Sequence, residues 1–486
     1  MAKRSVFKTL AFITLLFIVV WAAVILYWRS SNRIPNGADV ALYLIVLPVL
    51  LLLGYLGLRY GIDKVKQRKQ DAAVPDTAQG VVEAQPDTTL TYTLPLLASE
   101  TCFAAGDTPQ ALAEAARAGK LVDLHTRLKD ERGLPVFAAE VEAIDLDALD
   151  ETATDAVQAL SEAQKRALWL GESLAVKILD EHFASLVAAH AAPADTRGRS
   201  TATTALQIEW LLPARWTEDE RQLAQSWLVT QLAAQQWNAP QVTVATRTVD
   251  KAIQALKRLD DINVQFNQGT LVAHVLLLAS ESFIDDETIQ RWSQARQLHN
   301  ADTPEGRMPG EGACALLVGK PRGDEDSAAP RLHRIVFAQR AQSADARGRV
   351  DTSTLQSLLE QSLLQAAADT SLNDAGHVVA DTDTRPSRTA ESLQWVDHNA
   401  PDQDPTALLL SLGASTGDCG AASALASVAV AAALTAATQQ AGFALSLHDA
   451  YLRAVALIDT ATDAATDSNP TAADAAIAAT STPTLV

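Results

Sequence analysis

Residues 408–434, LLLSLGASTGDCGAASALASVAVAAAL, constrain the fold more than any other stretch of the chain. An apolar run at residues 408–412 gives way at Gly413 to small and hydroxyl residues, and an uncharged Ala/Val/Leu segment follows Gly420. This pattern predicts a buried strand, a glycine turn and a helix that is buried on every side. Such a helix needs a large core around it. In many α/β folds the free backbone N–H groups at the start of such a helix form a ligand site, which here would lie near residues 416–419.

Composition limits the classes of function. The 486 residues, 48% of them hydrophobic, are enough for a membrane segment plus one large or two medium domains. The net charge of −19 argues against nucleic acid as a main partner, because phosphate binding relies on clustered Lys and Arg. The cysteines, Cys102, Cys314 and Cys419, fit no metal-binding spacing and favour a reducing compartment.

The N-terminal region predicts a membrane anchor. Residues 6–28 and 40–58 are apolar runs of spanning length, too long and too closely spaced for a cleaved signal peptide. Three basic residues flank the first run outside, two lie between the runs and five follow the second, which favours both ends on the cytoplasmic side. We therefore expect a two-helix anchor at residues 1–69, a polar linker at 70–91 and a cytoplasmic domain after it.

Residues 92–459 alternate between strand and helix patterns, which is typical of layered α/β folds. We expect strands at residues 94–98, 205–212, 241–245, 271–279, 313–318, 334–338, 377–380, 408–412 and 443–447. We expect helices at residues 109–118, 155–191 (one or two), 217–235, 249–259, 286–297, 354–367, 388–395 and after Gly420. The strands at 313–318 and 334–338 should pair. The second half, about 346–459, echoes the element order of the first, about 92–345, and the Ala/Thr/Asp composition of residues 460–486 predicts a disordered tail.

Histidines and acidic residues give no clear metal motif. His182 and His190 lie eight residues apart on a helix without the glutamate of a zinc motif, and His274 lies within an apolar strand. We interpret these histidines as structural or surface residues and predict no metal ion and no cofactor. The acidic residues Glu281 and 285–287 are interpreted as the charged start of a helix.

Four segments resemble the β-ketoacyl synthases. Residues 309–318, PGEGACALLV, resemble the turn of that family that leads into an apolar strand, with Gly310, Glu311 and Gly312 as its motif. Residues 278–285, LASESFID, resemble the strand end and the turn that follow in the same enzymes. Residues 416–423, TGDCGAAS, resemble the Thr-Gly-His…Gly-Ala-Ala-Gly motif through Gly417 and Gly420, and residues 379–384, VADTDT, lie where the family has Ala-His-Gly-Thr-x-Thr. The order and spacing cover residues 92–458 and imply a thiolase-like fold of two similar layered α/β halves.

The sequence departs from the resemblance at the catalytic positions. The family uses a cysteine nucleophile at a helix N-terminus and two histidines that donate hydrogen bonds. The nucleophile should fall near residues 247–251, which hold no cysteine, and the histidine positions hold Asp381 and Asp418. The family's lysine is also missing near residues 413–414, as is its glycine-rich loop after 446. An ionised aspartate cannot donate to an oxyanion and repels a malonyl group, so we predict that condensation chemistry is lost.

A different chemistry is conceivable at the positions that depart from the family motif, Asp381, Asp383, Asp418 and Cys419. The cysteine and the three aspartates each have a functional and a structural interpretation. A helix N-terminus lowers a thiol pKa, which would favour a reactive Cys419, but Asp418 acts in the opposite direction, and we favour a small buried residue in a tight turn. The three aspartates would hold a cation if they converged. We favour solvated turn carboxylates or helix caps.

Two classes of function remain. The chain is similar to thiolase-like proteins that accompany effector genes in type VI secretion clusters, which implies a catalytically inactive adaptor at the inner face of a bacterial inner membrane. The alternative is an acyl-thioester-binding protein or a residual condensing enzyme of lipid or polyketide metabolism. A pocket filled by Phe266 or Trp395 would oppose this alternative. The family also implies a homodimer, or a pseudo-dimer with a related protein, through the strand at 241–245, whose alternation suits an exposed edge.

Overall fold

The computed structural model describes residues 88–190, 205–237, 241–271, 273–321, 329–346, 348–366 and 370–460. These residues belong to one compact unit, Asp87–Val486. The expected membrane anchor at residues 1–69, most of the linker and all of the tail but Thr460 lie outside the described residues. The last linker residues, Thr88–Thr91, form a short 3₁₀ turn, η2.

One mixed sheet of 11 strands organises the unit. Its order is β11-β10-β12-β13-β8-β1-β7-β6-β4-β5, and β9 pairs with β13 beside this path. The strands of the sheet are β1 (Thr93–Phe103), β4 (Leu206–Pro213), β5 (Val242–Val249), β6 (His274–Ser282), β7 (Glu311–Val318), β8 (Arg331–His333), β9 (Val336–Gln339), β10 (His377–Ala380), β11 (Leu409–Ser411), β12 (Gly442–Ser446) and β13 (Leu452–Asp459). A separate hairpin consists of β2 (Leu124–Lys129) and β3 (Pro135–Phe137).

The sheet contains an internal repeat. In the first half, β5, β4 and β6 are parallel, and β7 and β1 follow in antiparallel steps. In the second half of the sheet, β11, β10 and β12 are parallel, and β13 and β8 follow in the same antiparallel steps, although β8 precedes residue 346 in the chain. The long β1 pairs with both β7 and β8 and so joins the halves. The expectation of two similar α/β halves is thereby confirmed.

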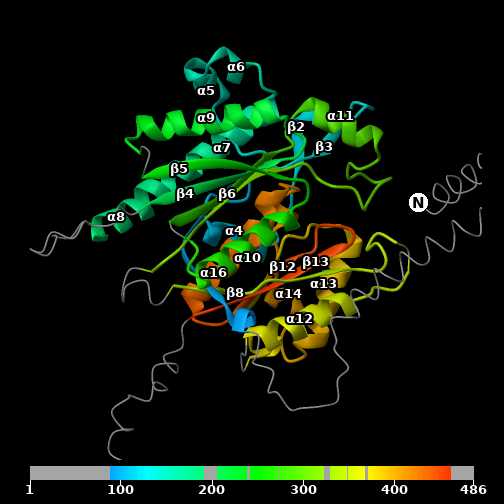
Figure 1. The fold of residues 1–486 in the computed structure, drawn as a ribbon. Coiled ribbons are helices and arrows are strands. Elements are labelled where there is room, and N and C mark those ends of the chain that lie inside the picture. The colour runs from blue at the N-terminus through cyan, green and yellow to red at the C-terminus, as the bar shows by residue number, and fades with distance from the viewer. Residues whose placement is uncertain are drawn as a thin grey trace, which may run out of the picture. The chain divides into compact units, whose positions relative to one another are not determined.

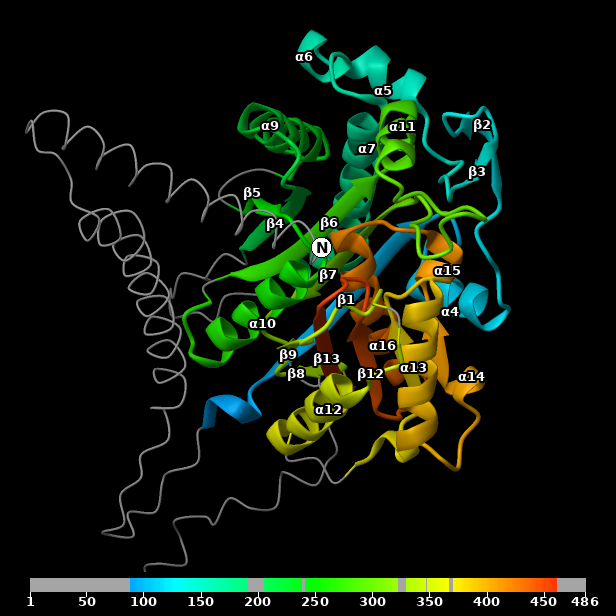
Figure 2. The ribbon, with the colours of Figure 1, turned by 90° about the vertical axis from the view of Figure 1, so that its right-hand side faces the viewer.

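Helices lie outside and between the two halves of the sheet (Figure 1). From top to bottom, Figure 1 shows α9 and α7, the first half of the sheet, α10 and α16, the second half of the sheet, and α12 with α13, and Figure 2 shows the same succession from the side. The main helices are α4 (Pro109–Arg117), α7 (Glu162–Ile178), α9 (Glu218–Ala234), α10 (Ile253–Asn267), α11 (Asp286–Gln294), α12 (Ser353–Ala366), α13 (Pro386–Asn399) and α16 (Ala421–Thr438). The short helices are α5 (Leu146–Thr152), α6 (Asp155–Gln158), α8 (Ala184–His190), α14 (Pro405–Leu408), α15 (Gly413–Thr416) and the 3₁₀ turn η4 (Leu372–Asp374). Three buried clusters of apolar side chains fill the interfaces between helices and sheet: one surrounds α10 and α16 and reaches both halves of the sheet, and the other two lie between each half and its outer helices.

Helix α16 occupies the centre of this arrangement, as the sequence predicted. It packs against β6 and β7 of one half and β10 and β12 of the other. Its small Ala and Ser side chains allow both halves of the sheet to approach it closely. The buried serine hydroxyls form hydrogen bonds within the helix, as Ser427 does by donating to the Ala424 carbonyl at 2.8 Å. Of the described helices, α16 is the one long and apolar enough to cross a bilayer, and 78% of that stretch is buried in the fold.

Several expected elements differ from those observed. The strands β7 and β9 do not pair with each other, because β7 lies between β1 and β6 while β9 lies on β13. The strand at 443–447 is not the last one, because β13 returns antiparallel beside it; the Ala and Leu residues of β13 fit helix and strand equally. The expected helix at 249–259 begins only at Ile253, since β5 continues to Val249. The expected long helix at 155–191 is divided, and a π-helical turn, η3 (Leu179–Phe183), interrupts it after α7.

Candidate functional site

A pocket of about 300 Å³ opens at the corner where the two halves meet. Its walls come from the starts of α10 and α16, from the loop after β12, and from the ends of β4 and β6. Because α10 and α16 occupy equivalent places in the repeat, each half directs one helix N-terminus to the same cavity. The pocket therefore lies where the resemblance places an active site.

The segment expected to carry the nucleophile does line this pocket, through residues 249–253. It contains Val249, Asp250, Lys251 and Ala252, and no cysteine lines any described part of the pocket. The Lys251 Nζ lies 2.9 Å from the Oδ2 of Asp449 on the opposite loop. A salt bridge therefore crosses the pocket from the segment where the resemblance expects the nucleophile.

Asp418, where the resemblance expects the second histidine, is a buried carboxylate between an arginine and a histidine side chain. Its Oδ2 lies 3.2 Å from His448 Nε2 and 3.1 Å from Arg307 Nη1, and its Oδ1 accepts a hydrogen bond from the Gly420 N–H at 3.0 Å. Burial by itself would raise the pKa of Asp418, but His448 and Arg307 outweigh burial and hold this pKa well below its usual range. Arg307 in turn stacks on the Trp292 ring, 4.0 Å from its centroid.

His448 has a partner at each ring nitrogen. Its Nε2 lies against Asp418, and its Nδ1 faces Arg385 Nη2 at 3.1 Å. Because a guanidinium can only donate, Nδ1 must accept and Nε2 must carry the hydrogen toward Asp418. Arg385 is itself held by Asp383 at 2.8 Å. Neither nitrogen of His448 is left to take a proton from a substrate.

Asp381, where the resemblance expects the first histidine, holds the loop after β12. It is 1% exposed and accepts hydrogen bonds from Ser446 Oγ at 2.6 Å, Leu447 N at 2.6 Å and His448 N at 3.1 Å. Burial raises the pKa of Asp381 above its ordinary value, although the hydrogen bonds and His448 act against the rise. This carboxylate fixes the loop that positions His448.

The expectation of solvated turn carboxylates or helix caps at Asp381, Asp383 and Asp418 is wrong. All three are buried, with exposures of 1%, 3% and 4%. They gather around the loop that carries His448, yet each faces its own donors within the protein. None of the three belongs to a group of side chains arranged for a shared metal ion among the described residues.

Glu281 and Arg215 form the other charged wall of the pocket. The guanidinium of Arg215 donates to both carboxylate oxygens of Glu281 and to the Ser282 carbonyl. Burial raises the pKa of Glu281, against the effect of Arg215. The interpretation of Glu281 as part of a helix start is therefore wrong; Asp285 is the residue that caps α11, accepting from the Thr288 N–H at 2.5 Å.

The glycines of the motif allow two chain segments to touch beneath the pocket. The Gly310 N–H donates to the Asp418 carbonyl at 3.1 Å, and the Asp418 N–H donates to the Met308 carbonyl at 2.8 Å. A Cβ at Gly310 would lie 2.1 Å from the Thr416 carbonyl oxygen, and Gly417 has a left-handed φ of +68°. Gly420 has φ +56° and faces Glu281.

Glu311 and Gly312 have structural roles in the same motif. The Glu311 carboxylate is fully buried and pairs with Arg166, whose Nε and Nη2 lie 2.7 and 2.6 Å from its two oxygens. Gly312 leaves room for the ring of Phe103, which a Cβ would approach to 2.2 Å. These residues support the fold and do not line the pocket.

Cys419 is the small buried residue that the sequence analysis favoured. Its side chain is 0% exposed and its Sγ lies 3.3 Å from the Thr416 carbonyl, to which it donates. Burial and the neighbouring Asp418 raise the pKa of the Cys419 thiol well above its usual range. The residue does not line the pocket.

Solved structures with similar folds include ketosynthases. A Streptomyces albus JA3453 oxazolomycin ketosynthase domain matches with a TM-score of 0.52 and 9% identity, covering 76% of this chain and 74% of its own. A chain of the AntDE:AntF complex, a type II PKS acyl-carrier protein with its ketosynthase bound to the hexaketide, matches with a TM-score of 0.50 and 11% identity over 76% of this chain and 100% of its own. The fold is the thiolase-like fold of the ketosynthases.

A third structure, the ishigamide ketosynthase/chain length factor, has 15% identity and a TM-score of 0.48 over 76% of this chain and 100% of its own. No protein-family model and no curated protein matches the sequence. The comparisons therefore establish the ketosynthase fold, and the function rests on the residues of this chain.

Sequence reasoning missed the basic side chains in and beside the pocket: Arg215, Lys251, Arg307, Arg385 and His448. Each lies far along the chain from at least one of its partners; Arg307 and Asp418, for example, are 111 residues apart. The one usable signal was His448, which follows the strand at 443–447 in the loop where the ketosynthase resemblance expects glycines.

Proposed function

We propose that this ketosynthase-fold protein does not catalyse condensation and acts as a binding or adaptor component. The observation that carries the proposal is the pocket itself. A condensing site needs a free nucleophile and hydrogen-bond donors directed at a developing oxyanion. Here Lys251, Arg215 and Arg307 each face a carboxylate of the same chain, and His448 is engaged at both nitrogens.

The proposed partner is a protein, either a secreted effector or a secretion component of a bacterial type VI system. This part of the proposal rests on the resemblance of the sequence to thiolase-like accessory proteins of such clusters. The apolar runs at 6–28 and 40–58 support a two-pass anchor in the inner membrane, which would hold the domain at the cytoplasmic face.

Recovery of partners from native membranes tests the adaptor proposal. The intact protein is cross-linked in its own cells, captured and analysed by mass spectrometry, with a second anchored protein of similar abundance as the control. An effector or a secretion component enriched over the control is the expected result. Enrichment of lipid-synthesis carrier proteins alone would contradict the proposal.

Acyl-thioester binding is the second candidate, and one observation favours it. Phe266 is packed against the central core and Trp395 is buried in the second-half core, so neither fills the pocket of about 300 Å³. A short acyl-pantetheine would meet Lys251 and the backbone at Gly420. Saturable binding of acyl-pantetheine that is lost in Gly420→Leu, but kept in Leu364→Ala on the surface, would favour this candidate over the adaptor.

We also propose that the domain forms a homodimer, or a pseudo-dimer with a related protein, through β5. This strand ends the sheet, and its only described strand partner is β4. Its exposed Thr and Arg side chains alternate in part with Val, which leaves a backbone edge able to accept another strand. Light scattering of the chain from Asp87 onward should give twice the monomer mass, and Val244→Pro should lower it; a monomer at high concentration would contradict this proposal.

A further inference from the structure

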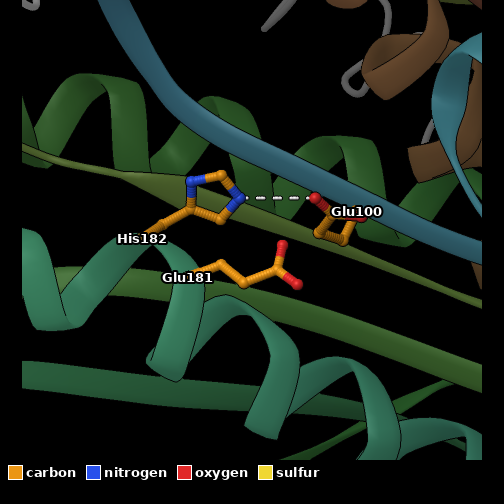
Figure 3. A group of neighbouring side chains, drawn as sticks. All are labelled: Glu100, Glu181 and His182. Atoms are coloured by element: carbon orange, nitrogen blue, oxygen red, sulfur yellow. Dashed lines mark hydrogen bonds and ion pairs between the residues drawn. The ribbon is translucent and has the colours of Figure 1, made fainter.

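A second cluster of ionisable groups lies away from the pocket, where η3 meets β1. It consists of Glu100 on β1 and of Glu181 and His182 on η3, and one potential ligand atom from each lies within 4.8 Å of the others. His182 Nε2 is 3.3 Å from Glu100 Oε1. Figure 3 shows that Glu181 and His182 leave the same helical turn and both extend toward the Glu100 carboxylate.

The π-helical turn accounts for this convergence. In an α-helix, with 3.6 residues per turn, consecutive side chains diverge by about 100°. The wider i→i+5 turn of η3 reduces that divergence, so two neighbouring residues can face one point. Such single π turns are rare and frequently occur at functional sites. The π-helical turn is a property of the backbone, so it supports a site here independently of the side-chain types.

The donor set fits a transition metal. Zn²⁺ binds histidine nitrogen and carboxylate oxygen at about 2.0–2.2 Å, which places tetrahedral ligand atoms roughly 3.4 Å apart. The three potential ligand atoms lie within 4.8 Å of one another, and a bound ion would draw them closer. Ca²⁺ and Mg²⁺ prefer oxygen ligands, so the imidazole disfavours them. We propose that Glu100, Glu181 and His182 bind a Zn²⁺-type divalent ion, with a fourth position open to water.

The surroundings of the cluster leave it open to solvent and place a lysine that would compete with a metal ion. The Glu100 side chain is 11% exposed, His182 is 36% exposed and Glu181 is exposed, so an ion can enter from solvent toward the buried carboxylate. Lys177, on the last turn of α7, lies 2.8 Å from Glu100 Oε2 and neutralises it without a metal. A bound ion would compete with the positive charge of Lys177 for the Glu100 carboxylate. Metal binding would then tie η3 to β1, the strand that joins the two halves of the sheet.

The competitor gives the proposal a distinctive test. Intact, untagged protein in detergent is freed of metal with a chelator and titrated with Zn²⁺ by calorimetry. One site per chain is expected, with affinity lowered at least about tenfold in Glu181→Gln and His182→Gln. The matched exposed variants Glu151→Gln and His398→Gln should bind as the wild type does. Lys177→Gln should bind Zn²⁺ several-fold more tightly, because it removes the competing cation.

A second readout separates binding from folding defects. The unfolding temperature of the wild type should rise with Zn²⁺ and not with Mg²⁺, and the His182→Gln variant should lose that rise while unfolding normally in chelator. Equal Zn²⁺ affinity in wild type and His182→Gln, or weaker binding in Lys177→Gln, would overturn the proposal and leave an ordinary ion-pair cluster. Absence of saturable Zn²⁺ binding would overturn it as well. None of these outcomes depends on the partner proposed for the pocket.

Discussion

Asp381 and Asp418 stand at the two histidine positions that the resemblance implied, and both are committed to the protein's own donors. Asp381 holds the loop of residues 446–448, and Asp418 holds His448 and Arg307. A catalytic histidine would present a free N–H to a substrate oxygen. At these two positions the chain has instead an internal network of hydrogen bonds and ion pairs, which ties both aspartates to the local structure.

Replacing Asp418 by Asn tests how strongly the network supports the fold. The variant keeps the shape of the side chain but leaves Arg307 and His448 without the Asp418 carboxylate. The unfolding free energy should fall by about 3 kcal/mol. This value is at the low end for breaking a buried ion pair, because Arg307 is partly exposed. Urea unfolding measures the loss. Glu218→Gln, at the exposed pair with Arg221, is the control and should show no measurable change. An equally stable Asp418→Asn variant would contradict the structural role.

The buried His377 predicts a pH dependence. Its Nε2 lies 3.0 Å from the Ala431 carbonyl, and burial lowers the pKa of His377 to about 4. Since the unfolded chain has an ordinary histidine pKa of about 6.5, the unfolded state binds more protons between these values. Stability should therefore fall as the pH drops from about 6.5 to about 4, by up to about 3 kcal/mol. Denaturant unfolding across this range should show a smaller fall in His377→Gln, and identical pH profiles would contradict the assignment.

At the residue scale, the sequence predicted the residues that belong to local motifs. It did not predict the ion pairs and hydrogen bonds between residues that are far apart in the chain. Gly417, Gly420 and the two aspartates could be placed because turn geometry and motif order act over a few residues. The partners of those aspartates come from other elements; Arg385 faces His448 across 63 residues. The burial of Asp383 could not be predicted either, because an aspartate in a turn rich in Thr and Asp is normally exposed to solvent. Only the structure shows that Arg385 pairs with it.

Among the elements, α16 and α10 have equivalent positions in the two halves and pack on each other in the central layer. The sequence predicted α16 well because this helix is apolar on all sides, as expected for a buried helix. In the structure, 14 of its residues are buried. It missed β13 and the hairpin of β2 and β3, whose alternation is weak. Burial on both faces, as in β6, was readable as a continuous apolar run.

Close packing around α16 predicts intolerance of larger side chains. Ala429 is 0% exposed in the central cluster, so Ala429→Leu should lower the unfolding free energy by about 1–3 kcal/mol through overpacking. Ala436→Leu, at an exposed position of the same helix, is the matched control and should be nearly neutral. Thermal and urea unfolding of the two variants compare them directly. Equal effects would mean that α16 is not packed on every side.

For the whole molecule, the repeat explains why a pocket forms at the corner where the two halves meet. The two halves bring one helix N-terminus each to a shared corner, and the glycines at 310 and 417 keep the segments beneath it in contact. This architecture needs small residues and buried ion pairs and has no requirement for a nucleophile. The architecture is thus compatible with the proposal that the protein binds a partner and does not catalyse condensation.

Acyl transfer is the measurement that tests the loss of condensation most directly. The intact protein is incubated with an acyl thioester and a malonyl thioester, and both the protein mass and the small-molecule products are determined by mass spectrometry. We predict no acyl adduct and no condensation product, with Cys419→Ala indistinguishable from the wild type, because Cys419 is buried with a raised thiol pKa. An acyl group on Cys419, or a condensation product above the protein-free control, would contradict the account.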